Sequence, residues 1–252
     1  VTPGQVLTIA TGGKGYVDSL SFSGSGGGGG GSFVVSSGSP LLIAGGGGGL
    51  RQAAGQNGNP GVVEEYGTTG SDYNSVGGGL PNSSIFGEGG SVTMDGYSYG
   101  SAGAGFYTNG MDDAGFGYGG IAFVNGSFTQ NDASISCSGF SADGGFGGGG
   151  QGNGCWGGGG GGGYTGGDGG HVAGGGGSYN IGTNQDNTSG VRSGNGLVVI
   201  SYAGTSSGDC GCTDPSAVNY DPSAIIDDGS CCYVSGCMDS IANNYDPSAC
   251  ID

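Results

Sequence analysis

The apolar residues of the chain are gathered into short runs separated by glycine-rich and polar stretches. Each run holds β-branched, aliphatic or aromatic residues and is bounded by Gly, Ser, Asn or Pro, which is the pattern of short β-strands. Asn125-Gly126, after one of these runs, predicts a hairpin turn because both residues tolerate positive φ. No run reaches the roughly 18 residues that a membrane-spanning helix needs, so we expect an all-β protein without membrane insertion. The expected strands are residues 6–9, 33–35, 41–44, 121–124 and 197–200.

Runs of glycine alternate with these apolar segments, and several abut an expected strand. A single glycine run is ordinarily a flexible loop, because ordering glycine costs the most backbone entropy and buries no side chain. Five runs in one domain allow another arrangement, since extended helices of three residues per turn that lack Cβ atoms can hydrogen-bond laterally. We therefore expect a packed bundle of polyglycine helices, with loops as the alternative. The runs are residues 26–31, 45–49, 147–150, 157–163 and 174–177.

The composition narrows the choice of fold and of partners. Glycine accounts for 71 of the 252 residues. It does not recur at every third position and only seven prolines are present, so a collagen triple helix is excluded. Three Lys and Arg residues stand against 20 Asp and Glu residues, giving a formal charge of −17. Such a chain repels phosphate backbones and anionic lipid headgroups, so we expect no nucleic acid partner.

Three stretches combine a strand with glycine in a way that resembles a known family. They are Pro40-Leu41-Leu42-Ile43-Ala44 before run 45–49, run 26–31 before Ser32-Phe33-Val34, and the closing segment 194–202. Over most of residues 1–203 the chain resembles the glycine-rich domain in the ectodomains of anaplastic lymphoma kinase and leukocyte tyrosine kinase, and of bacterial and phage surface proteins. The resemblance implies a β-sheet framework that carries a polyglycine-helix bundle, and it implies no kinase activity. In that family a strand and a glycine run usually precede the stretch that matches residues 1–9, and they are absent here. The chain starts at Val1 with no basic and apolar leader segment, so we expect a processed or incomplete chain.

Aromatic residues are concentrated between the glycine runs. We expect them to form the core, where each buried ring contributes about 2–3 kcal/mol and lies well against flat glycine backbone. The alternative is an exposed group of rings in segment 97–118 that binds a glycan or a host surface. The aromatic residues concerned are Tyr97, Tyr99, Phe106, Tyr107, Phe116, Tyr118, Phe123 and Phe128.

The sequence changes character after a linker at 204–209, where Cys, Asp and Pro replace glycine. Residues 212–227 align with residues 237–252, and eleven of the sixteen aligned positions are identical. We expect a first repeat at 210–235, an incomplete second repeat at 236–252 and further copies beyond them. The pattern is similar to cysteine-bounded Cys-Thr-Asp-Pro…Asp-Asp-Gly-Ser-Cys modules of secreted proteins, which distantly resemble thrombospondin type 3 repeats. That resemblance implies stalks stiffened by calcium.

Oxygen-bearing side chains crowd both repeats, which is hard-cation chemistry, because calcium takes six to eight oxygen ligands in irregular geometry. Calcium would offset carboxylate repulsion in a unit too small for a hydrophobic core. The spacing is not that of an EF-hand. The alternative assigns the same aspartates to turns, which Asp-Pro sequences favour. The candidate ligands are Asp214, Asn219, Asp221, Asp227, Asp228, Asp239, Asn244, Asp246 and Asp252.

Eight cysteines with one histidine indicate an oxidising, extracellular compartment. Six of the cysteines lie in the repeats and allow 15 connectivities. Cys212–Cys231, which joins the ends of the first repeat, is the preferred pair, Cys232–Cys250 is a second candidate, and Cys137–Cys155 would be a local bridge. Cys210 and Cys237 complete the set, and zinc is disfavoured because His171 is remote from every cysteine cluster. Asn82, Asn125 and Asn187 lie in glycosylation sequons.

Catalytic motifs carry little weight against this glycine background. Gly-x-Ser-x-Gly occurs twice without the strand-to-helix context of a nucleophile elbow, and no P-loop is present. We expect a secreted, non-enzymatic structural protein whose open sheet edge pairs with a strand from a second copy, giving a head-to-tail fibre. The alternative function is an adhesin that recognises a glycan or a cell surface.

Overall fold

The computed structural model describes residues 5–17, 25–51, 56–71, 79–92, 100–113, 115–126, 142–153, 156–201 and 210–251. The chain divides into two compact units, Val1–Val198 and Val199–Asp252. The expected linker at 204–209 lies outside the described residues. The division therefore falls a few residues before the position expected from the change in composition.

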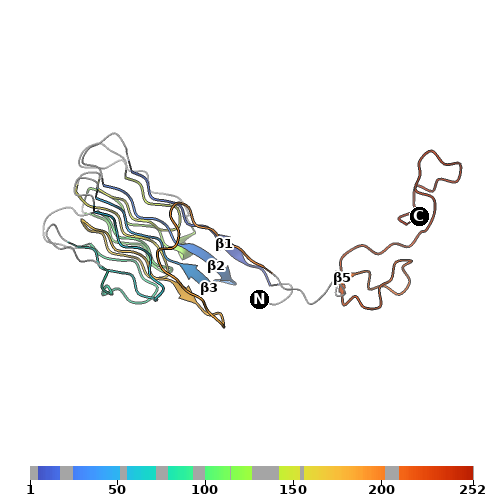
Figure 1. Cartoon of the computed structure of the whole chain (residues 1–252), viewed down its shortest axis with the longest axis horizontal. Coiled ribbons are helices and arrows are strands. Elements are labelled where there is room, and N and C mark those ends of the chain that lie inside the picture. Colours follow the sequence, from blue (N-terminus) through green and yellow to red (C-terminus); the bar gives the residue numbers. More distant parts are fainter. Residues whose placement is uncertain are drawn as a thin grey trace. The chain divides into compact units, whose positions relative to one another are not determined.

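A four-stranded antiparallel sheet organises the N-terminal unit (Figure 1). Its spatial order is β1-β2-β3-β4, so that β1 and β4 are the two edges. The first three strands correspond to the apolar runs expected at 6–9, 33–35 and 41–44. The strands are β1 (Thr8–Ala10), β2 (Ser32–Ser36), β3 (Ser39–Ala44) and β4 (Tyr179–Asn180).

A tight turn joins β2 to β3. Its two central residues both have positive φ, 49° at Ser37 and 78° at Gly38. Two such residues in succession match the twist of the flanking strands, which is why hairpins favour this turn. This hairpin is not the one expected from the sequence, which was at Asn125-Gly126.

The strand expected at 121–124 and the hairpin turn expected at Asn125-Gly126 are wrong. The chain instead forms a single 3-10 turn, η2 (Phe123–Asn125), and Gly126 closes it at φ 69° by donating its N–H to the Phe123 carbonyl. The physical reason is the Phe123 ring, which packs into the aromatic core at 4.9 Å from Phe33 and 5.1 Å from Phe106. Burial of this one side chain overrides the strand preference of its neighbours.

The glycine runs form the expected laterally bonded bundle. Run 157–163 is buried throughout and lies at its centre. Every third N–H points to the same neighbour: two go to segment 26–29, two to segment 101–104 and two to segment 170–174. Its hydrogen bonds run from Gly158 to Gly170, Gly161 to Gly174, Gly159 to Gly26, Gly162 to Gly29, Gly160 to Ser101 and Gly163 to Ala104, at 2.8–3.1 Å. This is the three-residue period expected of an extended glycine helix.

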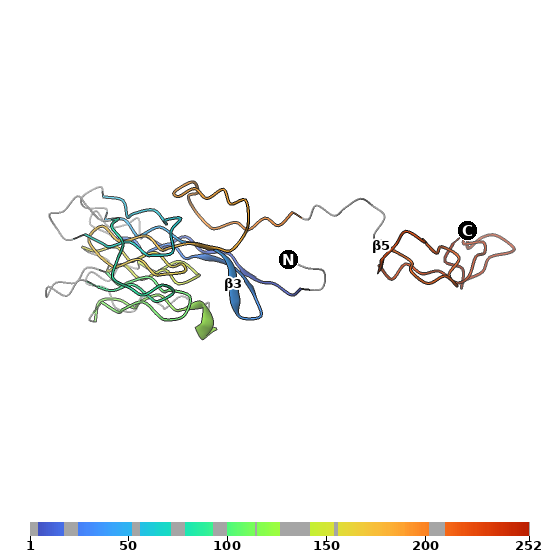
Figure 2. The same ribbon diagram turned by 90° about the horizontal axis from the view of Figure 1, so that it is seen from below.

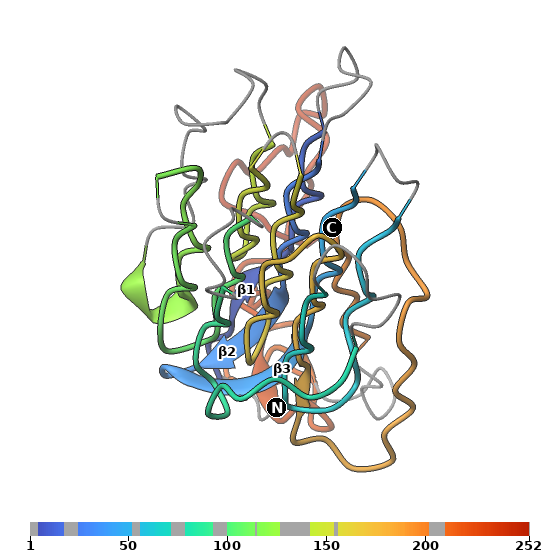
Figure 3. The same cartoon turned by 90° about the vertical axis from the view of Figure 1, so that its left-hand side faces the viewer.

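Missing side chains are what allow this packing. A Cβ atom on Gly160 would lie 2.1 Å from the Gly167 carbonyl oxygen, and one on Gly28 would lie 2.0 Å from the Gly160 carbonyl oxygen. Backbone hydrogen bonds therefore fill the interior that side chains fill elsewhere. Figures 1 and 3 show the resulting extended segments running side by side away from the sheet.

A small aromatic core lies where the bundle meets the sheet. Its buried members are Ala10, Phe33, Val35, Ile43 and Phe106, and Phe123, Phe146, Tyr164 and Tyr179 pack against them. Phe106 and Phe123 lie in this core, as expected from the sequence. The core expectation is wrong for Tyr107, Phe116 and Tyr118, which are exposed, and Tyr97, Tyr99 and Phe128 lie outside the described residues.

The C-terminal unit contains one short parallel pair, β5 (Cys210–Gly211) and β6 (Ile226–Asp227), with turns between and after the two strands. Apart from η2, the described residues contain no helix. The chain is therefore all-β with a disulfide-rich C-terminal region.

Candidate functional site

Strand β1 is an open edge of the sheet. Its residues pair with β2 alone, with Ile9 opposite Val34 and Ala10 opposite Phe33. Among the described residues no strand lies on the other side of β1. An unpaired edge presents a row of N–H and C=O groups that can template pairing with another chain.

An apolar stripe crosses the sheet next to this edge. Ile9, Val34 and Leu42 stand opposite one another on neighbouring strands and share one face. Val34 is buried, but 46% of Ile9 and 43% of Leu42 are exposed, and Val6, just before β1, is 79% exposed. The side chain at the centre of the stripe, Val34, is therefore shielded from solvent, whereas those at its two ends, Ile9 and Leu42, are accessible.

The strand expected at 197–200 is wrong, because the segment is extended but unpaired. Gly196 donates its N–H to the Gly12 carbonyl at 2.7 Å, and no backbone hydrogen bond joins residues 197–201 to another described residue. Leu197, Val199 and Ile200 are 60%, 73% and 52% exposed. An apolar, strand-like sequence lies exposed here because nothing described supplies the neighbouring strand.

The two C-terminal repeats share one local structure. The bridge of Cys212 with Tyr220 recurs between Cys237 and Tyr245, 25 residues later. A backbone hydrogen bond recurs with the same spacing. In the first repeat the Asp221 N–H donates to the Cys212 carbonyl, and in the second the Asp246 N–H donates to the Cys237 carbonyl, both at 3.0 Å. The sequence repeat is therefore also a repeat of backbone geometry.

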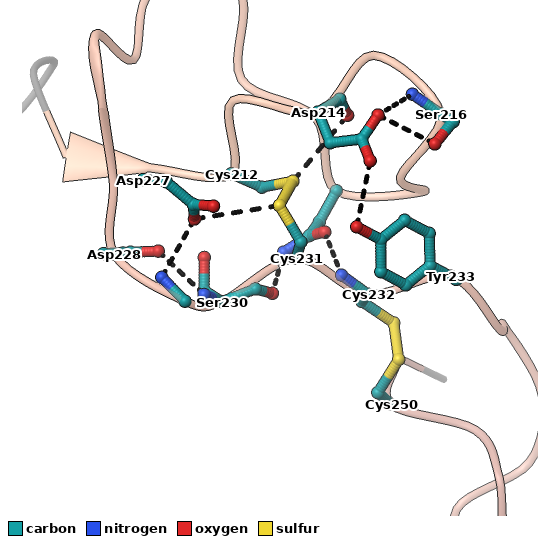
Figure 4. The surroundings of a disulfide bond; sticks show 12 residues. Cys212, Asp214, Ser216, Asp227, Asp228, Ser230, Cys231, Cys232, Tyr233 and Cys250 are labelled. Atoms are coloured by element: carbon teal, nitrogen blue, oxygen red, sulfur yellow. Dashed lines mark hydrogen bonds between the residues drawn. A yellow bond between two sulfur atoms is a disulfide. The ribbon is translucent and has the colours of Figure 1, made fainter.

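Two disulfides hold this unit together (Figure 4). Cys212 is bonded to Cys231 and Cys232 to Cys250, with Cα separations of 4.6 and 5.6 Å. Both are the pairs chosen from the sequence. Cys210 and Cys237 are free thiols, and the expected pair Cys137–Cys155 lies outside the described residues.

The aspartates of the repeats act as turn caps. Asp214 accepts hydrogen bonds from the Ser216 N–H and hydroxyl at 2.9 and 2.7 Å, and Asp221 does the same with Ser223. The Ser216 N–H and hydroxyl hold the pKa of Asp214 below its usual value, and the Ser223 hydroxyl and N–H do so for Asp221. Further caps join Asp227 to Gly229, Asp228 to Ser230, Asp239 to Ile241 and Asp246 to Ser248.

These contacts bear on the expected calcium site. Within the described residues no three His, Cys, Asp or Glu side chains gather in a way that could hold a metal ion. The Asn219 amide is also engaged, with the Ser230 carbonyl and the Cys232 N–H. The turn alternative accounts for the hydrogen bonds that these aspartates make. Calcium binding stays a prediction; Asp252 lies outside the described residues, and Asn244 has no contact that assigns it a role.

One buried carboxyl group was not singled out from the sequence. Asp168 is 8% exposed and accepts hydrogen bonds from the Ser91 N–H at 2.8 Å and the Asn82 amide at 3.0 Å. Burial raises its pKa, against the effect of these hydrogen bonds. His171 is buried nearby in the chain, at 4% exposure. The sequence Asp168-Gly169-Gly170-His171 would read equally well as an exposed turn, so it gives no sign that Asp168 and His171 are buried.

The glycosylation sequons differ in accessibility. Asn82 is buried, and its amide donates to the Gly166 carbonyl and to Asp168. Asn125 and Asn187 are exposed. The geometry therefore favours modification at Asn125 and Asn187 over Asn82.

Comparison with known proteins finds no family model that matches the chain and no similar curated protein. In the part of the chain that is described, no helix has the length and apolar character needed to cross a bilayer.

Proposed function

We propose that this chain is a secreted, non-enzymatic structural subunit that assembles with copies of itself by strand addition at β1. The observation that carries the proposal is the open edge of β1 beside the exposed side chains of Val6 and Ile9. Strand addition would supply the missing backbone hydrogen bonds and cover both side chains. The resemblance to glycine-rich surface domains and the two disulfides support an extracellular location.

The test compares two lysine variants of the full chain. Ile9→Lys places a charge on the open edge, where lysine discourages strand pairing. Val124→Lys is the matched control, since Val124 is 49% exposed on η2 and outside the sheet. Negative-stain microscopy and light scattering should show filaments or oligomers for the native chain and the control, and monomers for Ile9→Lys. A native chain that stays monomeric at every calcium concentration counts against assembly.

An adhesive function is the second candidate. Phe116 and Tyr118 are 39% and 37% exposed. Exposed aromatic rings are the side chains that glycan sites use most readily, because they present large apolar faces. Tyr97 and Tyr99, which the sequence also suggested, lie outside the described residues. A glycan-array signal that persists in a Phe116→Ala, Tyr118→Ala variant would reject this site.

A further inference from the structure

Five asparagine residues of the chain are followed directly by glycine. In such a pair the glycine nitrogen can attack the side-chain carbonyl carbon of the asparagine, because glycine has no Cβ atom to hinder the approach. The attack needs a side chain that is free to rotate and a nitrogen that can lose its proton. Hydrogen bonds to either group oppose it, so the structure decides which pairs react. The five residues are Asn57, Asn109, Asn125, Asn153 and Asn195.

In three of these pairs both reacting groups are held by hydrogen bonds. The glycine N–H donates to a backbone carbonyl in each pair, from Gly110 to Gly120, from Gly126 to Phe123 and from Gly196 to Gly12, at 2.7–3.2 Å. The second of these pairs closes η2, the green coiled ribbon in Figure 2. The asparagine side chains are held as well: the Ala122 N–H donates to Asn109 at 2.9 Å, the Asn125 amide to Asn109 at 2.7 Å and the Lys14 N–H to Asn195 at 2.9 Å.

Of the remaining two pairs, only Asn57-Gly58 lacks such contacts. The Asn153 side chain is fully buried and accepts the Gly157 N–H at 2.9 Å, and its glycine, Gly154, lies outside the described residues. Among the described residues, neither the Asn57 side chain nor the Gly58 N–H makes a hydrogen bond. Asn57 is also exposed, so water reaches the reacting groups.

We propose that Asn57-Gly58 is a site of spontaneous succinimide formation and deamidation. The Gly58 nitrogen gives its proton to solvent and bonds to Cγ of Asn57, while the bond from Cγ to the side-chain nitrogen breaks and ammonia leaves. Water then opens the five-membered ring at one of its two carbonyl carbons, which gives either aspartate or isoaspartate at position 57. One water is consumed and one ammonia released, so no oxidant, catalyst or partner chain is needed.

The two products differ in their effect on the glycine bundle. A Cβ atom on Gly58 would lie 2.2 Å from the Gly48 carbonyl oxygen, so the two backbones are in close contact. Asn59 donates its N–H to the Ala173 carbonyl and accepts the Gly48 N–H, both at 2.8 Å. Isoaspartate adds one carbon atom to the main chain directly before these contacts, whereas aspartate leaves the main chain unchanged. Only the isoaspartate form should therefore loosen the bundle.

The first test follows deamidation in the full chain with its disulfides intact. The protein is kept at mildly alkaline pH, either folded or in urea, and peptide mass spectrometry measures the replacement of NH2 by OH at each asparagine. In the folded chain Asn57 should react at least about tenfold faster than Asn109, Asn125 or Asn195, because each of these must first break its hydrogen bonds. In urea all should react at similar rates, since glycine follows each of them. Asn57→Gln is the matched control and should stop the reaction at this position, because its longer side chain would have to close a less favoured six-membered ring.

A second measurement separates the change of backbone from the change of charge. Asn57→Asp carries the charge of the modified protein on a native backbone, and its Tm should stay within about 2 °C of the native value, as expected of an exposed position. The isoaspartate form, separated from the incubated protein by chromatography, should melt about 3–8 °C below Asn57→Asp, because the hydrogen bonds of Asn59 are weakened.

Two results would overturn the site. One is an equal rate at Asn57 and at the other three asparagines of the folded chain, and the other is a ratio of rates that is the same in urea, since the fold would then have no part in the selection. An isoaspartate form that melts together with Asn57→Asp would overturn the effect on the bundle.

Discussion

Alanine at the centre of the glycine bundle should destabilise the N-terminal unit strongly, although it adds only one methyl group. Gly160 lies in the buried central run, where a Cβ atom would stand 2.1 Å from the Gly167 carbonyl oxygen and 2.6 Å from the Gly103 nitrogen. Both contacts are with backbone, so neither can be relieved by a change of side-chain rotamer. The bundle must widen locally.

The magnitude follows from the contacts of Gly160. Overpacking a close-packed interior costs about 1–3 kcal/mol. Widening also weakens the hydrogen bonds from the Gly160 N–H to Ser101 and from the Gly150 N–H to Gly160, now 2.8 and 2.9 Å long. Each such bond contributes about 0.5–1.5 kcal/mol. The lower entropy of the unfolded alanine chain offsets about 0.4–1 kcal/mol, which leaves a net loss of about 3 kcal/mol.

Calorimetry of the full chain measures this loss directly. A unit of this size loses about 2–4 °C of Tm per kcal/mol, so Gly160→Ala should lower the Tm by about 6–12 °C. Gly47→Ala is the control within the same bundle, because its methyl group would make only ordinary van der Waals contacts, the nearest at 3.5 Å from the Asn59 carbonyl oxygen, and it should leave the Tm unchanged or slightly higher. Equal Tm values for the two variants would refute the claim that backbone contacts form this interior.

The remaining predictions concern charge, disulfides and calcium. The pKa of Asp168 is raised by burial, so the folded state holds its proton to higher pH than the unfolded chain does, and stability falls as pH rises from about 4 through the raised pKa. Asp168→Asn should remove that decline in urea titrations at several pH values; an unchanged slope would contradict it. Replacing Cys212 and Cys231 together by serine should destabilise the C-terminal unit by about 3 kcal/mol, since the bridge closes a loop of 19 residues. Equal resistance of both forms to proteolysis in that unit would count against this. Chelation of calcium should lower the Tm of the C-terminal unit if the repeats bind the ion, and no change would leave their aspartates as turn caps alone.

Sequence reasoning recovered features that depend on neighbours along the chain. Apolar runs next to glycine located β1, β2 and β3, and the spacing of the repeats located the bridge Cys212–Cys231. It failed where a distant contact decides the local structure. Phe123 is drawn into an aromatic core built from remote segments, so its run forms a 3-10 turn. Residues 197–200 have the composition of a strand, but a strand also needs a partner.

The three-residue period of the central run has a consequence for how such a domain can vary. Every substitution of a buried glycine introduces a Cβ atom or a larger group. At most positions of the bundle that atom would clash with neighbouring backbone, so single substitutions there destabilise the domain. Gaining or losing three glycines is different, because it returns every following N–H to the neighbour it faced before. The bundle can therefore lengthen or shorten in register, one helical turn at a time, while its interior chemistry stays fixed.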